Sequence, residues 1–174
     1  MGLNVRVVKL LVKIFLFIIV VFSVVPSVKA QENIHKVQSL YIYNFAKYIK
    51  WNNLEEKFIV GIYASNEAFN QLNEVLKVRT IGGKVFEVKK LNTPEDASDC
   101  HIVFIDNTHI SKLKKIQEQA NLQNTLLVTA TDSIDKGASI SFVVKDSKLK
   151  FKINVDACKQ AGLNISHNLL ALGV

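Results

Sequence analysis

The chain has 174 residues, of which 49% are hydrophobic, 22 are Lys or Arg and 15 are Asp or Glu. This length suits one domain, and the apolar fraction together with only two Pro residues excludes a disordered or collagen-like chain. Residues 1–30 hold four basic residues and no acid, which leaves 18 basic and 15 acidic residues in 31–174. Because no basic stripe is interleaved with aromatic residues, nucleic acid is excluded as a partner.

Residues 1–30 have the composition of a secretory signal peptide. Three basic residues precede an apolar run at 14–25, which is followed by Pro26 and by a small residue, Ala30, before the expected cleavage point. A helix of these 12 residues, of which only Ser23 is polar, is too short for the ~30 Å hydrocarbon core of a bilayer, which argues against a permanent anchor. We therefore expect cleavage after Ala30, a mature domain of residues 31–174 and a periplasmic location.

Hydrophobic periodicity then predicts alternating helices and strands. A helix is expected over 33–51, and its buried face is expected to comprise Ile34, Val37, Leu40, Tyr41, Phe45, Tyr48 and Ile49. Strands are expected at 58–64, 84–91, 101–105, 125–130, 140–144 and 148–155. Further helical segments are expected after Ser65-Asn66, near Pro94-Glu95, at 111–120, and on either side of Gly162.

This order predicts an α/β fold: a single three-layer domain whose mostly parallel sheet of about six strands is flanked by about five helices. The amphipathic strands 84–91 and 148–155 are expected at the edges, because polar and apolar residues alternate along them, and the apolar strands at the centre. The short Lys145-Asp146-Ser147 connection predicts a C-terminal β-hairpin. No internal repeat or linker divides 31–174, which favours one domain.

The two cysteines, Cys100 and Cys158, have two interpretations. In an oxidising compartment an even count favours a disulfide, which would contribute about 2–4 kcal/mol. Two separate buried thiols would instead behave as small hydrophobic residues. The order of the strands decides whether the two Cα atoms come within about 7 Å, so both states stay open from the sequence.

Two groups of side chains are candidates for a partner or ligand surface. Tyr43 lies off the apolar stripe of the first helix and Trp51 lies at its end, although packing on the sheet explains most aromatic residues there. The second group follows strands whose carboxyl ends would bind a ligand in an open α/β sheet. It consists of Ser65, Asn66, Asp106, Asn107, Thr131 and Asp132. Each of these also suits a helix cap or turn, so their convergence at one rim would be informative.

The sequence contains no recognisable catalytic or metal-binding pattern. It has no G-x-S-x-G, H-E-x-x-H or Walker motif, and Gly82-Gly83-Lys84 precedes a strand rather than a helix, which predicts a turn. Cys100 and His101 are adjacent at the start of a strand and should point to opposite faces. We therefore predict a non-enzymatic protein with no cofactor and no metal site.

Three segments resemble, in order, the YfiR family of small periplasmic proteins. They are residues 40–51 (LYIYNFAKYIKW), 100–105 (CHIVFI) and 140–170 (ISFVVKDSKLKFKINVDACKQAGLNISHNLL). The resemblance covers almost all of 34–172, and it departs from the family at Trp51-Asn52, where Trp-Pro is usual. It implies a sheet flanked by helices, in agreement with the periodicity.

The resemblance also implies a function that composition and spacing do not reveal. Characterised members bind the sensory periplasmic region of a membrane diguanylate cyclase, which lowers cyclic di-GMP and biofilm formation. We therefore expect a regulatory protein whose partner is such a cyclase, or another receptor such as a histidine kinase, with a homodimer as a further state to test. The alternative is a periplasmic module that senses a small ligand. A periplasmic enzyme is supported only by the cleft-forming fold class.

Overall fold

The computed structural model describes residue 13, residues 27–51 and residues 56–174. The chain divides into the units 1–34 and 35–174, and the fold described below is that of the second unit. The expected signal peptide lies almost entirely outside the described residues. Helix α2 (Ser27–Tyr48) includes Ala30, the residue before the expected cleavage point. None of the described helices combines the length and the apolar character that crossing a bilayer requires.

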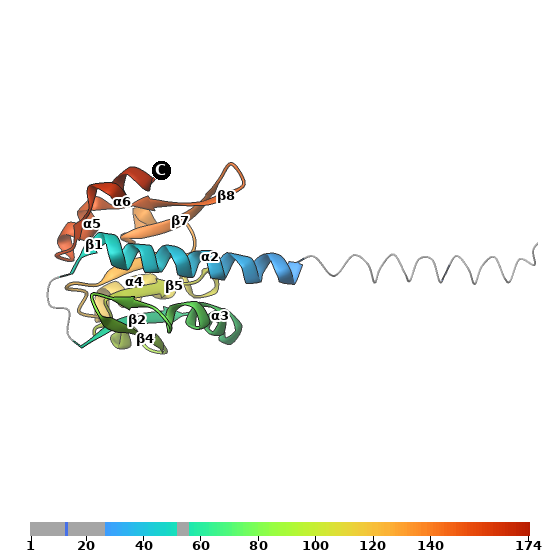
Figure 1. Ribbon diagram of the computed structural model, residues 1–174, viewed down its shortest axis with the longest axis horizontal. Coiled ribbons are helices and arrows are strands. Elements are labelled where there is room, and N and C mark those ends of the chain that lie inside the picture. Colours follow the sequence, from blue (N-terminus) through green and yellow to red (C-terminus); the bar gives the residue numbers. More distant parts are fainter. Residues whose placement is uncertain (1–12, 14–26, 52–55) are drawn as a thin grey trace, which may run out of the picture. The chain divides into compact units, whose positions relative to one another are not determined.

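A seven-stranded sheet forms the centre of the unit, in the order β3-β4-β2-β5-β6-β7-β8 (Figure 1). Its strands are β2 (Lys57–Tyr63), β3 (Thr80–Ile81), β4 (Lys84–Lys90), β5 (Ile102–Ile105), β6 (Leu126–Thr129), β7 (Ile140–Lys145) and β8 (Lys148–Ile153). The four inner pairings, β4 with β2, β2 with β5, β5 with β6 and β6 with β7, are parallel. The outermost pairings, β3 with β4 and β7 with β8, are antiparallel.

The expectation of a mostly parallel sheet of about six strands is wrong, because the sheet has seven strands and is mixed. The two-residue β3 is too short to produce a period in the sequence, yet it places β4 one position inside the edge. A separate antiparallel pair, β1 (Ile49–Lys50) with β9 (Asn164–Ile165), is also absent from the sequence-based expectation. This pairing ends α2 at Tyr48, three residues before the expected end of the helix.

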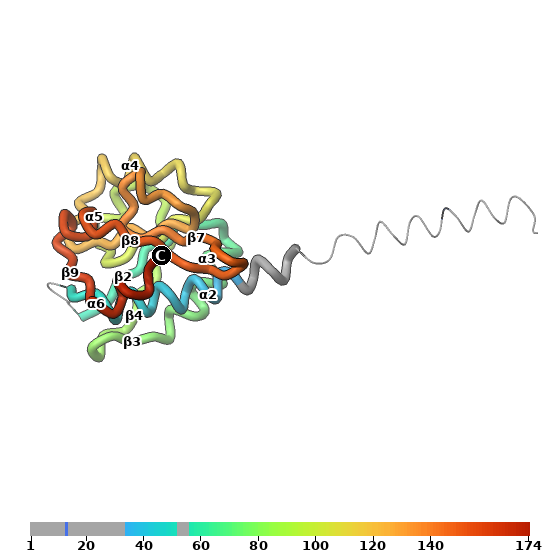
Figure 2. Tube along the Cα trace, turned by 90° about the horizontal axis from the view of Figure 1, so that it is seen from above, coloured from blue at the N-terminus to red at the C-terminus, as the bar shows by residue number. Residues whose placement is uncertain are grey.

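Helices cover both faces of the sheet. The described α-helices are α2, α3 (Asn66–Leu76), α4 (Lys112–Gln119), α5 (Val155–Gln160) and α6 (His167–Leu172). Short 3₁₀ turns lie at η1 (Pro94–Ala97), η2 (Asn107–His109) and η3 (Ile134–Lys136). Figure 2 shows α4 and α2 on opposite sides of the strands, which gives three layers.

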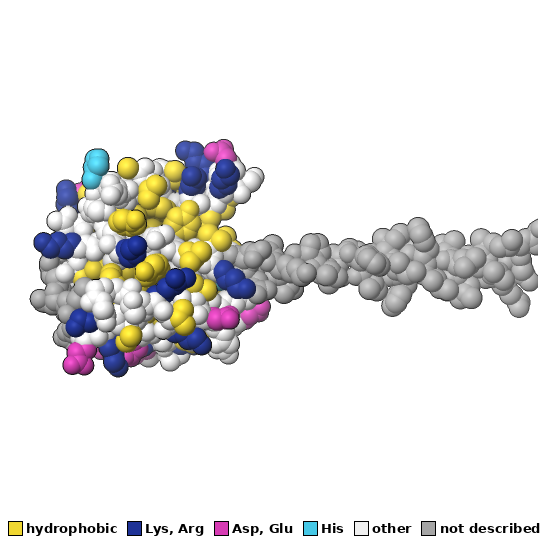
Figure 3. Space-filling model, in the orientation of Figure 1, with side chains coloured by type: hydrophobic (Ala, Val, Ile, Leu, Met, Phe, Trp, Pro, Cys, Tyr) yellow, Lys and Arg dark blue, Asp and Glu magenta, His cyan; other side chains and the backbone are white. Residues whose placement is uncertain are grey.

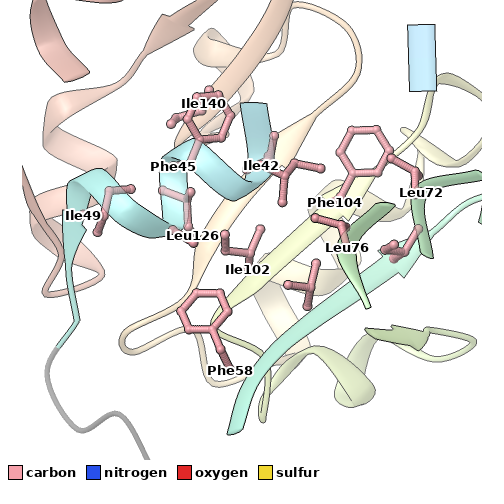
Figure 4. Close-up of a cluster of buried hydrophobic side chains, with 14 of the residues drawn as sticks. Ile42, Phe45, Ile49, Phe58, Leu72, Leu76, Ile102, Phe104, Leu126 and Ile140 are labelled. Carbon is pink, nitrogen blue, oxygen red and sulfur yellow. The ribbon is translucent and has the colours of Figure 1, made fainter. Parts of the chain in front are cut away.

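Each face of the sheet has its own hydrophobic core. On the α2 side, residues of α2 and α3 point onto strands β2, β5, β6 and β7 (Figure 4). The labelled side chains are Ile42, Phe45, Ile49, Phe58, Leu72, Leu76, Ile102, Phe104, Leu126 and Ile140. On the other side, Leu113 and Ile116 of α4 pack against Val103 and Ile105 of β5. The central strands are therefore buried on both faces, as parallel strands require.

The buried side of α2 differs from the one expected. Val37, Leu40 and Tyr48 are 39%, 46% and 37% exposed, whereas Ile42 and Ala46, which lie outside the expected buried face, are fully buried. The physical reason is that α2 is apolar around most of its circumference, so that a helical period does not select one side. One apolar side of α2 packs on the sheet and another remains in contact with solvent.

Candidate functional site

The carboxyl ends of the parallel strands bring the predicted polar residues to one rim of the sheet. Ser65 and Asp106 follow β2 and β5, and Thr131 lies just beyond β6; these strands are neighbours in the order β2-β5-β6. The backbone N–H of Ser65 donates to Asp106 Oδ2 at 3.2 Å, which joins two strand ends directly. In one part of the rim, Ser65, Asn66 and Asp106 form hydrogen bonds within the fold. In the other part, Asn107, Thr131 and Asp132 line a cleft.

Asp106 organises the first part of the rim. Its Oδ1 accepts hydrogen bonds from Thr108 Oγ1 at 2.8 Å and from the backbone N–H of His109 at 2.9 Å. His109 Nδ1 also lies 2.8 Å from Oδ1. Burial raises the pKa of Asp106, but the hydrogen bonds from His109, Thr108 and Ser65 together hold it below its ordinary value. Asp106 is thus an ionised structural link whose two oxygens are both in use.

Ser65 and Asn66 are engaged within the fold as well. Ser65 Oγ accepts from the backbone N–H of Ala68 at 3.2 Å and is the N-cap of α3. Asn66 Oδ1 accepts from Lys90 Nζ on β4. A ligand at this part of the rim would have to replace contacts that hold α3 and β4 in place.

The remaining rim residues, Asn107, Thr131 and Asp132, line an open cleft of about 670 Å³. The β7–β8 hairpin supplies its apolar wall. Lys152 Nζ donates to Asp132 Oδ2 at 2.6 Å, and this contact lowers the pKa of Asp132 and raises that of Lys152. An apolar wall with a few polar groups at one side is suited to a small molecule with one polar end.

The two aromatic candidates are placed differently. Trp51 is only 8% exposed; its ring packs edge-on against Phe58 with centroids 5.0 Å apart, and its Nε1–H donates to Ala46 O at 2.8 Å. Tyr43 is half-buried, with the Arg79 guanidinium 5.2 Å from the centroid of its ring. Trp51 therefore belongs to the core, and only Tyr43 is partly accessible to a partner.

The two cysteines are free thiols in different core clusters. Cys100 Sγ contacts Asp96 O at 3.5 Å, and Cys158 Sγ lies 3.8 Å from Ser139 O. Burial raises the pKa of Cys100 to about 12 and that of Cys158 to about 11, so neither is a thiolate at neutral pH. A Cβ at Gly61 would lie 2.6 Å from Cys100 Sγ, and the close approach of β2 to this thiol therefore favours glycine.

Exposed apolar side chains gather on the side of the molecule formed by α2, α6 and the C-terminus (Figure 3). We define this α2–α6 face by Val37, Leu40, Tyr48, Leu172 and Val174, which are 37–60% exposed. Tyr48 O accepts from Ser166 N–H at the start of α6, and Val174 N–H donates to Phe151 O of β8. The first bond joins the end of α2 to the start of α6, and the second joins the C-terminus to β8.

The charge of the α2–α6 face has one sign. Residues 35–50 contain Lys36, Lys47 and Lys50 and no acid, and residues 163–174 contain no Asp, Glu, Lys or Arg. An apolar surface that also carries lysines is complementary to an apolar partner surface that carries carboxylates. This face was not predicted from the sequence, because Val37, Leu40 and Tyr48 were expected in the core. The signal that could have revealed it is the surplus of apolar residues around α2.

No group of three or more His, Cys, Asp or Glu side chains in the described part of the chain is arranged to hold a metal ion. Cys100 and His101 lie on opposite faces of the sheet: Cys100 belongs to the α4-side core, and the His101 ring stacks on Phe58 at 4.7 Å. What the described arrangement offers is an apolar face and an open cleft.

Comparison with known proteins identifies a family to which the chain is similar. The sequence model of the YfiR/HmsC-like family matches residues 35–174, the unit that contains the sheet and the α2–α6 face. The match covers well over half of the chain. No curated protein gives a significant match.

Proposed function

The chain belongs to the YfiR/HmsC-like family, and from that membership we propose that it is a periplasmic regulatory protein that binds the periplasmic region of a membrane diguanylate cyclase. Binding would lower cyclic di-GMP and biofilm matrix, and the chain itself would catalyse no reaction. The family match over residues 35–174 is the observation that carries this proposal. Export through a signal peptide cleaved after Ala30 is part of the same proposal.

The α2–α6 face is the surface that we assign to the partner. Its exposed Leu40 and Leu172 offer apolar contact area, and the lysines of α2 favour a partner surface with carboxylates. A second copy of the chain is the competing occupant of the same face. Light scattering on the purified chain separates the two, because a stable homodimer that Leu40→Gln dissociates would favour the second copy.

Deletion and complementation test the proposal. Deleting the gene should raise intracellular cyclic di-GMP and matrix, and wild-type complementation should restore the lower level. The double variant Leu40→Gln/Leu172→Gln should fold normally and fail to restore it, because a central apolar contact is lost. Val78→Gln is a matched control, since Val78 is 70% exposed and follows α3, outside the α2–α6 face. Unchanged cyclic di-GMP after deletion contradicts the proposal.

The second candidate function is a small-ligand sensor, which the cleft at Asn107, Thr131 and Asp132 favours. A compound that binds the folded chain selectively raises its melting temperature. We expect such a compound to lose its effect in Thr131→Val/Asp132→Leu, whereas Asn66→Ala, at the other part of the rim, should keep it. A compound library that produces no shift would leave the cleft without a ligand role.

A further inference from the structure

The excess positive charge of residues 31–174 is concentrated in one hairpin. Residues 145–152 contain four lysines and one acid, Asp146. The rest of 31–174 contains 14 basic and 14 acidic residues and is therefore neutral overall. The net charge of residues 31–174 is +3, and the β7–β8 hairpin alone accounts for it.

The strand register places these lysines on a single face of the hairpin. Lys145 is directly opposite Lys148, and Lys150 is directly opposite Val143. Directly opposite residues share a face, and residues two apart along a strand also share it. Lys145, Lys148 and Lys150 therefore form a lysine cluster at the end of the hairpin that is remote from the other strands. Figure 3 shows dark blue side chains gathered at this end.

The fold does not neutralise this cluster. Lys152, nearer the base of the hairpin, has a counter-ion, because its Nζ lies 2.6 Å from Asp132 Oδ2. Among the described residues, no ion pair is formed by the three cluster lysines within 4.0 Å. Like charges directly opposite each other destabilise a pair of strands. The cluster therefore opposes the stability of the hairpin that carries it, and folding alone does not account for it.

The same hairpin presents apolar groups on its other face. Val144 is 73% exposed, the largest value among the exposed large hydrophobic residues described, and it is directly opposite the half-buried Leu149. The connecting residues Asp146 and Ser147 both have positive φ, of 52° and 56°, which gives a tight turn. Lysines and exposed apolar side chains thus meet at one compact tip.

We infer that the tip of the β7–β8 hairpin binds the surface of a bilayer that contains anionic phospholipid. Lysine clusters are attracted to such surfaces, and an adjacent apolar side chain adds contact area at the boundary with the acyl chains. The cationic residues are all Lys, which acts as a point charge, rather than Arg, whose planar group fits carboxylates in a bidentate geometry. This favours a diffuse anionic surface over a specific acidic protein segment. The inference goes beyond the proposed function and does not require it.

Vesicle binding tests the inference. The purified chain is titrated with vesicles of phosphatidylcholine alone and of phosphatidylcholine mixed with phosphatidylglycerol. The test variant is Lys145→Gln/Lys148→Gln/Lys150→Gln, and the control is Lys77→Gln/Lys114→Gln/Lys115→Gln, which removes the same charge from exposed sites elsewhere. All forms carry the same N-terminus, verified by mass spectrometry, so any contribution of 1–30 cancels in the comparison.

We expect the wild type and the control to bind the mixed vesicles more tightly than phosphatidylcholine alone. The test variant should lose on the order of 100-fold in this preference, about fivefold for each lysine near the surface. Added salt should weaken wild-type binding, and Val144→Gln should weaken it without changing the salt dependence. Circular dichroism should show that the variants are folded.

Three results would overturn the inference. The first is equal wild-type binding to the two kinds of vesicle. The second is an equal loss in the test variant and the control, which would indicate a response to net charge alone. The third is vesicle binding that the test variant leaves unchanged, which would favour an acidic protein as the partner of the cluster instead.

Discussion

The two edges of the main sheet are built alike and charged differently. Each ends in an antiparallel pair closed by a tight turn with left-handed backbone, at Gly82-Gly83 on one edge and Asp146-Ser147 on the other. Near the β3–β4 edge, Glu87 lies 2.8 Å from Lys57 Nζ and 3.6 Å from Lys89 Nζ. At the tip of the β7–β8 edge, the lysines face one another.

The charges at the two edges therefore have different explanations. A carboxylate between two ammonium groups needs no external partner, so the β3–β4 edge is explained by the fold. The facing lysines of the β7–β8 hairpin have no such carboxylate partner among the described residues, and we assign them to an anionic surface outside the molecule. The surplus apolar residues of α2 lead to a similar conclusion, because the side that does not pack on the sheet stays exposed.

The largest expected effect concerns the hydrophobic anchors of the two edges. Phe151 of β8 and Phe86 of β4 are 2% and 4% exposed, with ring centroids 5.0 Å from Phe45 and 4.9 Å from Phe58. Phe151→Ala and Phe86→Ala should each lower the free energy of unfolding by about 3–5 kcal/mol. Urea denaturation measures both. A small loss at Phe151 alone would show that the β7–β8 edge is less firmly anchored than the β3–β4 edge.

The two turns should differ in how much a substitution changes the free energy of unfolding. Gly83 has φ of 78° and open space where a Cβ would lie, so Gly83→Ala should cost about 1 kcal/mol through backbone strain alone. Ser147→Gly relieves the strain of a left-handed backbone but gives the unfolded chain more conformational freedom. The free energy of unfolding should therefore change by less than about 0.5 kcal/mol. Thermal unfolding of the two variants provides the measurement, and a larger loss at Ser147 than at Gly83 would contradict the expectation.

The smallest effect is on ionisation. Hydrogen bonds from Lys57 and Lys152 lower the pKa of Glu87 and of Asp132, respectively. A lowered carboxyl pKa stabilises the fold above the unfolded value of about 4, and this contribution is lost as the pH falls through the folded pKa. Carbon-13 NMR titration should find both pKa values below the ordinary range, and Lys57→Gln and Lys152→Gln should each raise only the partner's value. Ordinary pKa values in the wild type would show that the charges are not paired in solution.

Features that depend on local chemistry could be predicted well from the sequence. The Ser65 cap, the buried strand expected at 101–105, the Gly82-Gly83 turn and the C-terminal hairpin all follow from residue type and spacing. Features that depend on tertiary contacts could not be predicted from the sequence. Two-residue strands such as β3 have no period, and a helix apolar on most sides does not indicate which side the sheet will cover.

The candidate site shows the same division. Asp106, Asn107 and Thr131 reach one rim because β2, β5 and β6 are parallel neighbours, as the alternation of strands and helices indicates for this part of the chain. The exclusion of Trp51 from the surface depends on Phe58 and on the carbonyl of Ala46, contacts that no sequence pattern specifies. The exposed side of α2 depends in the same way on the positions of the neighbouring strands.

Photocrosslinking in living cells tests whether the chain binds a membrane cyclase through the α2–α6 face. A photoreactive residue is placed at Leu40 on that face or, as the control, at Val78, and the adducts are identified by mass spectrometry. We predict an adduct from position 40, and not from position 78, with a membrane protein that has a diguanylate cyclase domain. Equal adducts from both positions, or adducts from position 40 with only a second copy of the chain, would contradict the account.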